Sequence, residues 1–199
     1  MDNVMKTNAI VRQCIADSVT IREAILADEG LLQRVEKVAE ILVQALRNGH
    51  RVLWCGNGGS AADAQHLAAE LSGRFYYDRP PLNSEALHCN TSYLTAVAND
   101  YGYDLIYSRM IDGACREGDV LIGISTSGNS RNILNAFEKA KQLGVVTVAM
   151  TGDTGGEMRQ VADVLLNVPS ADTPRIQECH IMLGHIICQI VEAAMFPQE

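Results

Sequence analysis

The sequence of 199 residues lacks the features that would assign it to a membrane, secreted or disordered class. It has no apolar run near the roughly 20 residues that a membrane-spanning helix requires. Its first residues lack the continuous apolar segment of a signal peptide. Proline is scarce, at five residues, while 47% of the residues are hydrophobic, which is typical of a folded globular chain. We therefore expect one domain over residues 1–199, located in the cytoplasm.

The chain also lacks an excess of basic residues. Sixteen Lys and Arg against 24 Asp and Glu give a formal net charge of −8. This charge argues against a nucleic-acid partner, because such proteins carry a basic patch or stripe. It does not exclude an anionic small molecule, since backbone N–H groups and a helix N-terminus can hold a phosphate. We expect a small-molecule substrate, with no nucleic-acid or membrane partner.

No Cys-x-x-Cys pair is present among the six cysteines. In a chain expected in the cytoplasm, such residues are typically small buried hydrophobic groups rather than a disulfide framework. We therefore expect no disulfide and no catalytic thiol among Cys14, Cys55, Cys89, Cys115, Cys179 and Cys188.

Two helical patterns, over residues 2–28 and 31–48, precede any predicted strand. They are expected to form an N-terminal helical hairpin that either packs against another subunit or covers one face of the sheet. After residue 50, short apolar runs alternate with helical patterns, which predicts a parallel sheet covered on both faces. The fold class is therefore α/β, a three-layer α-β-α sandwich. The predicted strands are 51–55, 84–89, 119–125, 145–152 and 164–169, and the last helix spans 174–195.

A hydroxyl-rich loop, STSGNS at 125–130, follows the third predicted strand and opens a helix. Its hydroxyls, on Ser125, Thr126, Ser127 and Ser130, exceed what capping a helix needs. No Walker lysine follows, which argues against a nucleoside triphosphate. This loop predicts a site for one sugar-phosphate group.

A glycine-rich loop, GNGGSA at 56–61, follows the first predicted strand. It also matches the dinucleotide fingerprint G-x-G-x-x-A. That fingerprint expects an acidic residue at the end of the second strand, where this chain has His88, Cys89 and Asn90. The loop is better explained as a turn whose exposed amides bind a polar ligand, or as a tight turn alone. Both loops are expected at the carboxyl edge of the sheet, where ligands bind.

Metal-capable side chains occur on two predicted helices. His66 and Glu70 are one turn apart and share a face, although an exposed pair with no ligand has the same spacing. On the last helix, His185 is compatible in spacing with Gln177 or Glu178, and His180 is a further candidate. Periodicity alone does not choose among these three.

Taken together, the motifs resemble the sedoheptulose 7-phosphate (phosphoheptose) isomerase family, within the sugar-isomerase (SIS) fold. They cover nearly the whole chain: two leading helices, GNGGSAADAQH, AELSGRF, AVANDYGYD, EGDVLIGISTSGNS, TGDTGGEM and RIQECH followed by GHI. The resemblance implies a flavodoxin-like sheet of five parallel strands over residues 50–199, with residues 1–49 contributing to oligomerisation. It also implies a cytoplasmic homotetramer with sites at subunit interfaces and one zinc ion per subunit.

The same resemblance implies roles for individual residues. The zinc ligands would be His66, Glu70, Gln177 and His185, so the choice of Gln177 over Glu178 follows from the family. The catalytic residues would be Glu70, His185 and Asp63, the last in catalysis or in support of the ligands. The substrate would be bound by Asn57, Gly58, Gly59, Glu70, Asn99, Asp100, Ser125, Thr126, Ser127, Ser130 and Gln177.

The implied reaction interconverts D-sedoheptulose 7-phosphate and D-glycero-D-manno-heptose 7-phosphate through an enediol, the entry to the ADP-heptose of lipopolysaccharide. An alternative of a different class is a non-catalytic protein of the same fold that associates with the replication initiator DnaA. That branch resembles this chain through the first glycine-rich motif and RIQE. It lacks the acid and imidazole found here as Glu70 and His185, so the isomerase is the favoured hypothesis.

Overall fold

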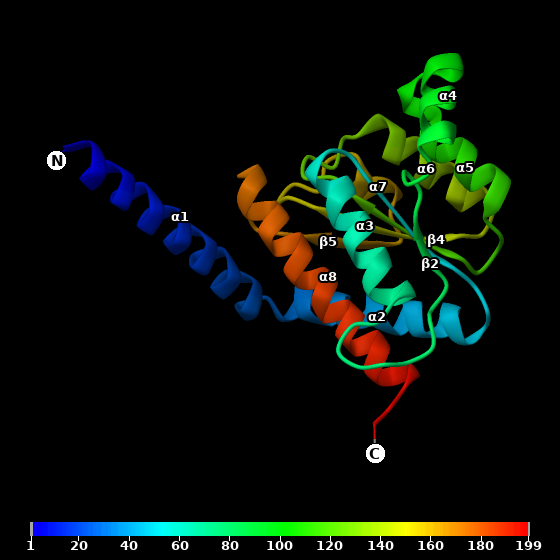
Figure 1. Cartoon of the computed structure of the whole chain (residues 1–199), viewed down its shortest axis with the longest axis horizontal. Coiled ribbons are helices and arrows are strands. Elements are labelled where there is room, and N and C mark those ends of the chain that lie inside the picture. The colour runs from blue at the N-terminus through cyan, green and yellow to red at the C-terminus, as the bar shows by residue number, and fades with distance from the viewer. Residues whose placement is uncertain (1, 199) are drawn as a thin grey trace.

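The computed structural model describes residues 2–198 of the chain, and side chains over residues 7–198 (Figure 1). In chain order the elements are α1 (Asp2–Ala27), α2 (Glu29–Arg47), β1 (Val52–Gly56), α3 (Gly59–Ser72), β2 (Ser84–Ala86), α4 (Thr91–Tyr101), the 3-10 turn η1 (Tyr103–Leu105), α5 (Ile106–Ala114), β3 (Val120–Ile124), α6 (Arg131–Gln142), β4 (Val146–Thr151), α7 (Met158–Val161), β5 (Val164–Asn167) and α8 (Thr173–Met195).

All five strands run parallel, in the order β2-β1-β3-β4-β5. This is the flavodoxin-like order, and the predicted α/β fold class is confirmed. β1 and β3 are neighbours, with Gly56 opposite Ile124 at their carboxyl ends. The loops that follow these two strands therefore start side by side, as the sequence predicted.

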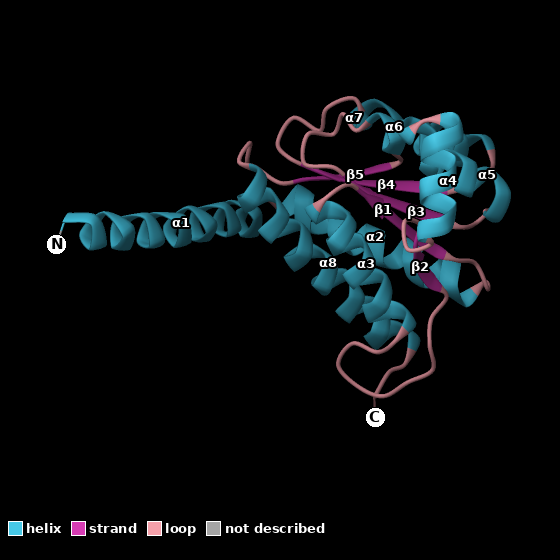
Figure 2. Cartoon of the chain, turned by 45° about the horizontal axis from the view of Figure 1, so that its top comes forward, coloured by secondary structure: helices cyan, strands magenta, loops and turns pink. Residues whose placement is uncertain are grey.

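Helices cover both faces of the sheet (Figure 2), and a hydrophobic cluster lies on each face. Strand residues alternate between them: Trp54 belongs to one cluster and Leu53 to the other. On the first face the sheet packs against α2, α3 and α8, and on the second against α5 and α6. Because both faces are covered, the strands read as continuous apolar runs in the sequence.

The two leading helices take different places. Asp28 caps α2 by accepting a hydrogen bond from Leu31 N at 2.9 Å, and α2 buries its apolar face on the sheet. At its other end Asn48 is the cap, and Gly49 has a φ of +78°, which glycine adopts without strain. In contrast, α1 extends away from the body of the molecule (Figure 1).

Two expectations need correction. The second strand ends at Ala86 rather than at residue 89, because the chain turns and Cys89 N donates to Ala86 O. The cysteines are free, but Cys14 and Cys89 are exposed, and the other four are buried as expected. Among the described residues, no helix is both long and apolar enough to cross a bilayer.

Candidate active site

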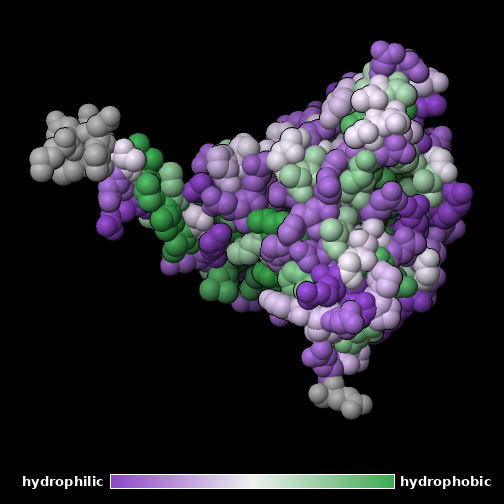
Figure 3. All heavy atoms as spheres, viewed as in Figure 1, coloured by the Kyte–Doolittle hydropathy of each residue, from purple (hydrophilic) through white to green (hydrophobic). Residues whose placement is uncertain are grey.

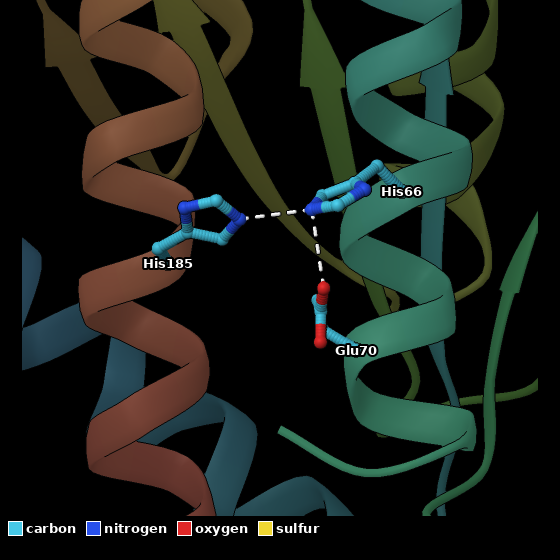
Figure 4. Close-up of side chains that lie close together, drawn as sticks. All are labelled: His66, Glu70 and His185. Atoms are coloured by element: carbon cyan, nitrogen blue, oxygen red, sulfur yellow. Dashed lines mark hydrogen bonds and ion pairs between the residues drawn. The ribbon is translucent and has the colours of Figure 1, made fainter. Parts of the chain in front are cut away.

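Two helices supply a cluster of three side chains, His66 and Glu70 from α3 and His185 from α8 (Figure 4). His66 Nε2 lies 2.9 Å from His185 Nε2 and 3.1 Å from Glu70 Oε1. One ligand atom from each residue falls within 4.8 Å of the other two. The cluster remains open to solvent, since the His66 side chain is 50% exposed and that of Glu70 22%.

α3 and α8 approach closely because Gly184 has no side chain. A Cβ at Gly184 would lie 2.4 Å from Leu67 Cδ1 on α3, which is closer than real contacts allow. Leu67 directly follows His66 in the sequence, and Gly184 directly precedes His185. The packing of the Leu67 side chain against Gly184 therefore sets the distance between the imidazoles.

The cluster fits a divalent metal ion of the zinc type. Zinc takes imidazole nitrogen and carboxylate oxygen at about 2.0–2.2 Å, which separates tetrahedral ligand atoms by roughly 3.3 Å. The distances of 2.9 and 3.1 Å that meet at His66 Nε2 are close to that separation. Three such ligands leave a fourth position for another side chain, water or substrate.

The candidates that spacing left open on α8 lie in different surroundings. His180 is fully buried, and its Nε2 lies 3.1 Å from the Thr151 carbonyl oxygen. Burial lowers the pKa of His180 to about 4, with the Thr151 contact opposing this shift. Glu178 forms an ion pair with Arg175 at 2.7 Å. Both residues thus have partners outside the cluster.

Gln177 lies over the start of α3. A Cβ added to Gly59 would come within 2.5 Å of Gln177 Nε2, so the glycine makes room for the amide. Gln177 thereby joins the glycine-rich loop to the last helix. This is a position beside the predicted polar-ligand loop, and its role as a ligand stays a prediction.

Asp63 lies half-buried on α3, one turn before His66. Its Oδ2 is buried and has no hydrogen-bond partner among the described residues. Burial raises the pKa of the Asp63 carboxyl, and the nearby His66 partly offsets that rise. An unpartnered carboxylate oxygen next to a candidate ligand is suited to orienting that ligand or to exchanging a proton.

The hydroxyls of the 125–130 loop converge. Ser125 Oγ lies 2.8 Å from Ser130 Oγ and 3.5 Å from Ser127 Oγ. Ser130 occupies the cap position of α6, yet its hydroxyl makes no capping bond. Helix capping therefore does not account for these hydroxyls. Together with the start of α6 they can accommodate an anion.

A second loop, residues 152–156, packs over the first. Gly152 N donates to Thr126 O at 2.9 Å, and Met158 N donates to Gly128 O at 3.0 Å. Gly128 has a φ of +67°, and a Cβ there would lie 2.1 Å from Gly155 O. Only glycine therefore fits at this crossing, which fixes the shape of the hydroxyl-rich loop.

Asn57, predicted to bind substrate, links the glycine-rich loop to the start of α6, the helix that follows the hydroxyl-rich loop. Its amide exchanges two hydrogen bonds of 2.9 Å with the amide of Asn132 on α6. Tyr103 OH also donates to Asn57 Oδ1 at 3.1 Å. The sequence reasoning missed Asn132 and Tyr103, although Tyr103 belongs to the AVANDYGYD motif that it had noted.

Asn99 and Asp100 lie on the exposed end of α4. Asn99 Nδ2 donates to Asp100 Oδ1 at 2.8 Å, and both residues are exposed. Gly58, with a φ of +57°, and Gly59 are exposed at the start of α3. The structure thus brings the loop glycines to the beginning of the site helix, while Asn99 and Asp100 contact each other at the end of a different helix.

Three further residues near the cluster were not anticipated. The ring of Phe75 lies 5.7 Å, centroid to centroid, from that of His185. Arg79 and Glu192 form a buried ion pair at the ends of the two site helices. Phe75 ends the AELSGRF motif, whereas Arg79 lies outside it. No local pattern connects Arg79 with Glu192, because they are 113 residues apart.

Comparisons with known proteins agree over almost the full length. A family model described as the SIS domain matches residues 16–152. A phosphoheptose isomerase of Aneurinibacillus thermoaerophilus is 52% identical over 189 residues, covering 95% of this chain and 96% of the relative. The solved phosphoheptose isomerase of Neisseria gonorrhoeae has a TM-score of 0.88 at 41% identity, covering 94% and 99% of the two chains. That of Francisella tularensis has a TM-score of 0.89 at 34% identity, covering 93% and 97%.

Proposed function

The chain belongs to the phosphoheptose isomerase family, and we propose that it interconverts D-sedoheptulose 7-phosphate and D-glycero-D-manno-heptose 7-phosphate at the cluster of His66, Glu70 and His185. The observation that carries this proposal is the cluster itself, formed on α3 and α8, together with its place in the fold: α3 begins at the glycine-rich loop, and the hydroxyl-rich loop follows the neighbouring strand β3. Acid–base groups and a phosphate cradle are the two parts that such a reaction needs. The product would enter the ADP-heptose pathway of lipopolysaccharide.

The hydroxyl-rich loop anchors the substrate. Ser125, Thr126, Ser127 and Ser130 donate to the phosphate, assisted by N–H groups at the start of α6. Binding the phosphate at a fixed point sets how far the sugar chain reaches. The carbonyl end of the substrate then extends toward α3, with Gly58, Gly59 and Gln177 along the path. Asn57 acts by holding the two loops together, given its bonds to Asn132.

Isomerisation moves the carbonyl between C1 and C2 through a cis-enediol. A base removes the proton next to the carbonyl, the proton returns to the neighbouring carbon, and the two oxygens exchange a proton. Glu70 has two carboxylate oxygens, so contact of Oε1 with His66 leaves the second for the carbon-bound proton. His185 would transfer the proton between the oxygens, a step in which its Nε2 is free of the metal, and Asp63 orients His66.

Zinc is the proposed cofactor, one ion per subunit, with His66, Glu70 and His185 as ligands and Gln177 as the fourth. For His66, Glu70 and His185 the fit is supported by the donor types and by the short distances between the ligand atoms. A bound zinc ion would polarise the substrate carbonyl as a Lewis acid.

We further propose a homotetramer with sites at subunit interfaces, in the cytoplasm. Support comes from α1, whose exposed side carries large apolar residues (Figure 3). Ile15 is 61% exposed and Leu26 72%. Between α1 and α8, Leu26, Met182 and Ile190 line an apolar hollow of about 410 Å³. Apolar surface on this scale favours association with further copies of the chain.

The proposed function is tested by conversion of sedoheptulose 7-phosphate with the purified full-length protein. Assays before chelation, after chelation and after zinc is restored show whether the activity depends on the metal. We expect turnover that is lost on chelation and recovers with zinc. A folded protein without turnover under any metal condition would exclude the isomerase and direct attention to DnaA binding. Turnover that survives complete metal removal would exclude the zinc proposal alone.

A further inference from the structure

The loop that leaves α3, residues 73–83, is attached to α8 by a buried ion pair. Arg79 Nε lies 3.0 Å from Glu192 Oε1, and their side chains are only 2% and 1% exposed. The loop curves around the C-terminal end of α8 before it enters β2 (Figure 1). The pair therefore joins the two helices that supply the metal-capable cluster.

Arg79 binds the end of α3 directly. Its Nη2 donates to Glu70 O at 2.8 Å, and its Nη1 donates to Leu71 O at 2.7 Å and Gly73 O at 2.9 Å. The last carbonyls of a helix have no partner within the helix, and a positive charge is favourable there. Arg79 thus holds the backbone of Glu70, a member of the cluster.

Glu192 holds the other side. It accepts hydrogen bonds from Phe75 N at 2.8 Å and Tyr76 N at 2.7 Å, in addition to the contact with Arg79. Glu192 follows His185 by seven residues, which is two turns along the same face of α8. The segment that it anchors places the Phe75 ring against the His185 ring.

Stability alone is a weak reason for this arrangement. A buried ion pair gains little over well-packed apolar residues, because removing two charges from water is costly. Burial raises the pKa of Glu192, but the N–H groups of Tyr76 and Phe75 together with Arg79 outweigh burial and lower it overall. The carboxylate is therefore charged and fully used in fixing one geometry.

We propose that Arg79 and Glu192 are positioning residues that fix the Glu70 backbone and the Phe75–His185 contact, and through them the geometry of the cluster. This inference rests on the proposed function for its catalytic consequence, although the positioning itself does not depend on turnover. Neither residue belongs to the metal-capable cluster or to the two loops proposed to bind substrate. Their effect is exerted through the two helix segments that they join.

The test compares Glu192→Gln with Asp119→Asn in the full-length protein. Asp119 is a matched control, since it is 2% exposed and also accepts two backbone N–H bonds, from Arg51 and Arg116. It directly precedes β3 and is bonded to the segments before β1 and β3, not to the helices that carry the cluster. Three quantities are measured: the NMR shift of the His185 ring, the zinc affinity and the kinetic constants.

For Glu192→Gln we expect a changed His185 resonance and a zinc affinity and kcat each about 10- to 100-fold lower, the range found when groups supporting metal ligands are removed. KM should change by less than about threefold, since the phosphate loop is untouched. Arg79→Lys, which keeps the charge but reaches fewer carbonyls, should lie between Glu192→Gln and the wild type. Asp119→Asn should lower the unfolding midpoint without altering the His185 resonance, the zinc affinity or the kinetic constants.

Equal values of all three quantities in Glu192→Gln and Asp119→Asn would overturn the inference. Should Glu192→Gln fail to fold, the same comparison applies to Arg79→Lys, for which wild-type values would overturn it. A wild-type protein without isomerase activity would contradict the proposed function instead. In that case the His185 resonance still decides whether the pair positions the cluster.

Discussion

Polar groups at the amino edge of the sheet differ from those on helices α3 and α8 in whether the chain itself supplies their hydrogen-bond partners. At the amino edge, the buried carboxylate of Asp119 is satisfied within the chain, by Arg51 N at 2.8 Å and Arg116 N at 2.9 Å. On helices α3 and α8, Asp63 Oδ2 is buried without a partner among the described residues, and the nitrogens of His66 and His185 lie 2.9 Å apart. Polar groups left incomplete by the fold mark where an outside ligand completes them.

A hollow alone does not make a site. The amino edge has one of about 590 Å³, lined by residues that include Lys37, Gln44 and His50. Among the described residues, the metal-capable cluster is formed by α3 and α8 and does not line this hollow. The candidate site is therefore identified by side chains that converge rather than by the size of a cavity.

The largest expected effect comes from breaking the cluster. Glu70→Gln and His185→Ala should each lower kcat by at least about 100-fold, because they remove groups that exchange protons with the substrate. Circular dichroism should show the fold retained. The matched changes Glu85→Gln and His50→Ala, near the amino ends of the strands, should leave kcat within about twofold. Wild-type turnover in His185→Ala would remove His185 from the mechanism.

Next in size is the effect of filling the crossing of the two loops. Gly128→Ala places a Cβ 2.1 Å from Gly155 O at a φ of +67°, so the hydroxyl-rich loop must shift. We expect KM for the phosphorylated sugar to rise at least about 10-fold and stability to fall by about 1–3 kcal/mol. Gly113→Ala is the control, because a Cβ there meets nothing within 4 Å. An unchanged KM in Gly128→Ala would argue against phosphate binding by this loop.

His180 predicts a pH dependence of stability. Its pKa in the folded protein is lowered to about 4, so between there and about 6.5 the unfolded chain binds a proton that the folded chain does not. Stability is therefore full above that window and falls as the pH decreases through it, by about 3 kcal/mol in all. Urea unfolding at several pH values measures this. His180→Gln should remove this contribution, and an unchanged slope would contradict it.

The smallest effect is expected at the exposed amino-edge pair of Arg51 and Glu85. Their charged atoms lie 2.7 Å apart, but the side chains are 27% and 59% exposed. Glu85→Gln should change the free energy of unfolding by less than about 1 kcal/mol, because solvent and salt screen such pairs. Urea denaturation checks this directly. A loss as large as that of Asp119→Asn would show that exposure does not separate the two carboxylates.

Local patterns predicted most of the fold. The spacing of apolar residues indicated α2 and α8, and the alternation of strands and helices indicated the parallel sheet. The loops after β1 and β3 could be placed together because neighbouring parallel strands end at one edge. The second strand was predicted to be longer than it is. It ends at Ala86 because of a turn closed by the hydrogen bond from Cys89 N to Ala86 O, which composition does not reveal.

The site was less accessible to sequence reasoning. Periodicity left Gln177, Glu178 and His180 open, because all three fall within the range of helix rotation that could approach His185. Contacts separate two of them: His180 with Thr151 on β4, and Glu178 with Arg175 one turn earlier on α8. The bonds between Asn57 and Asn132 span 75 residues, so no local signal could predict them.

The most direct test of the site is a crystal structure of the full-length protein with zinc and sedoheptulose 7-phosphate. We predict an anomalous zinc peak within about 2.0–2.2 Å of ligand atoms of His66, Glu70 and His185. The phosphate should lie within hydrogen-bonding distance of Ser125 and Ser130. Zinc away from this cluster, or the sugar phosphate in the hollow at the amino edge, would contradict the assignment of the active site.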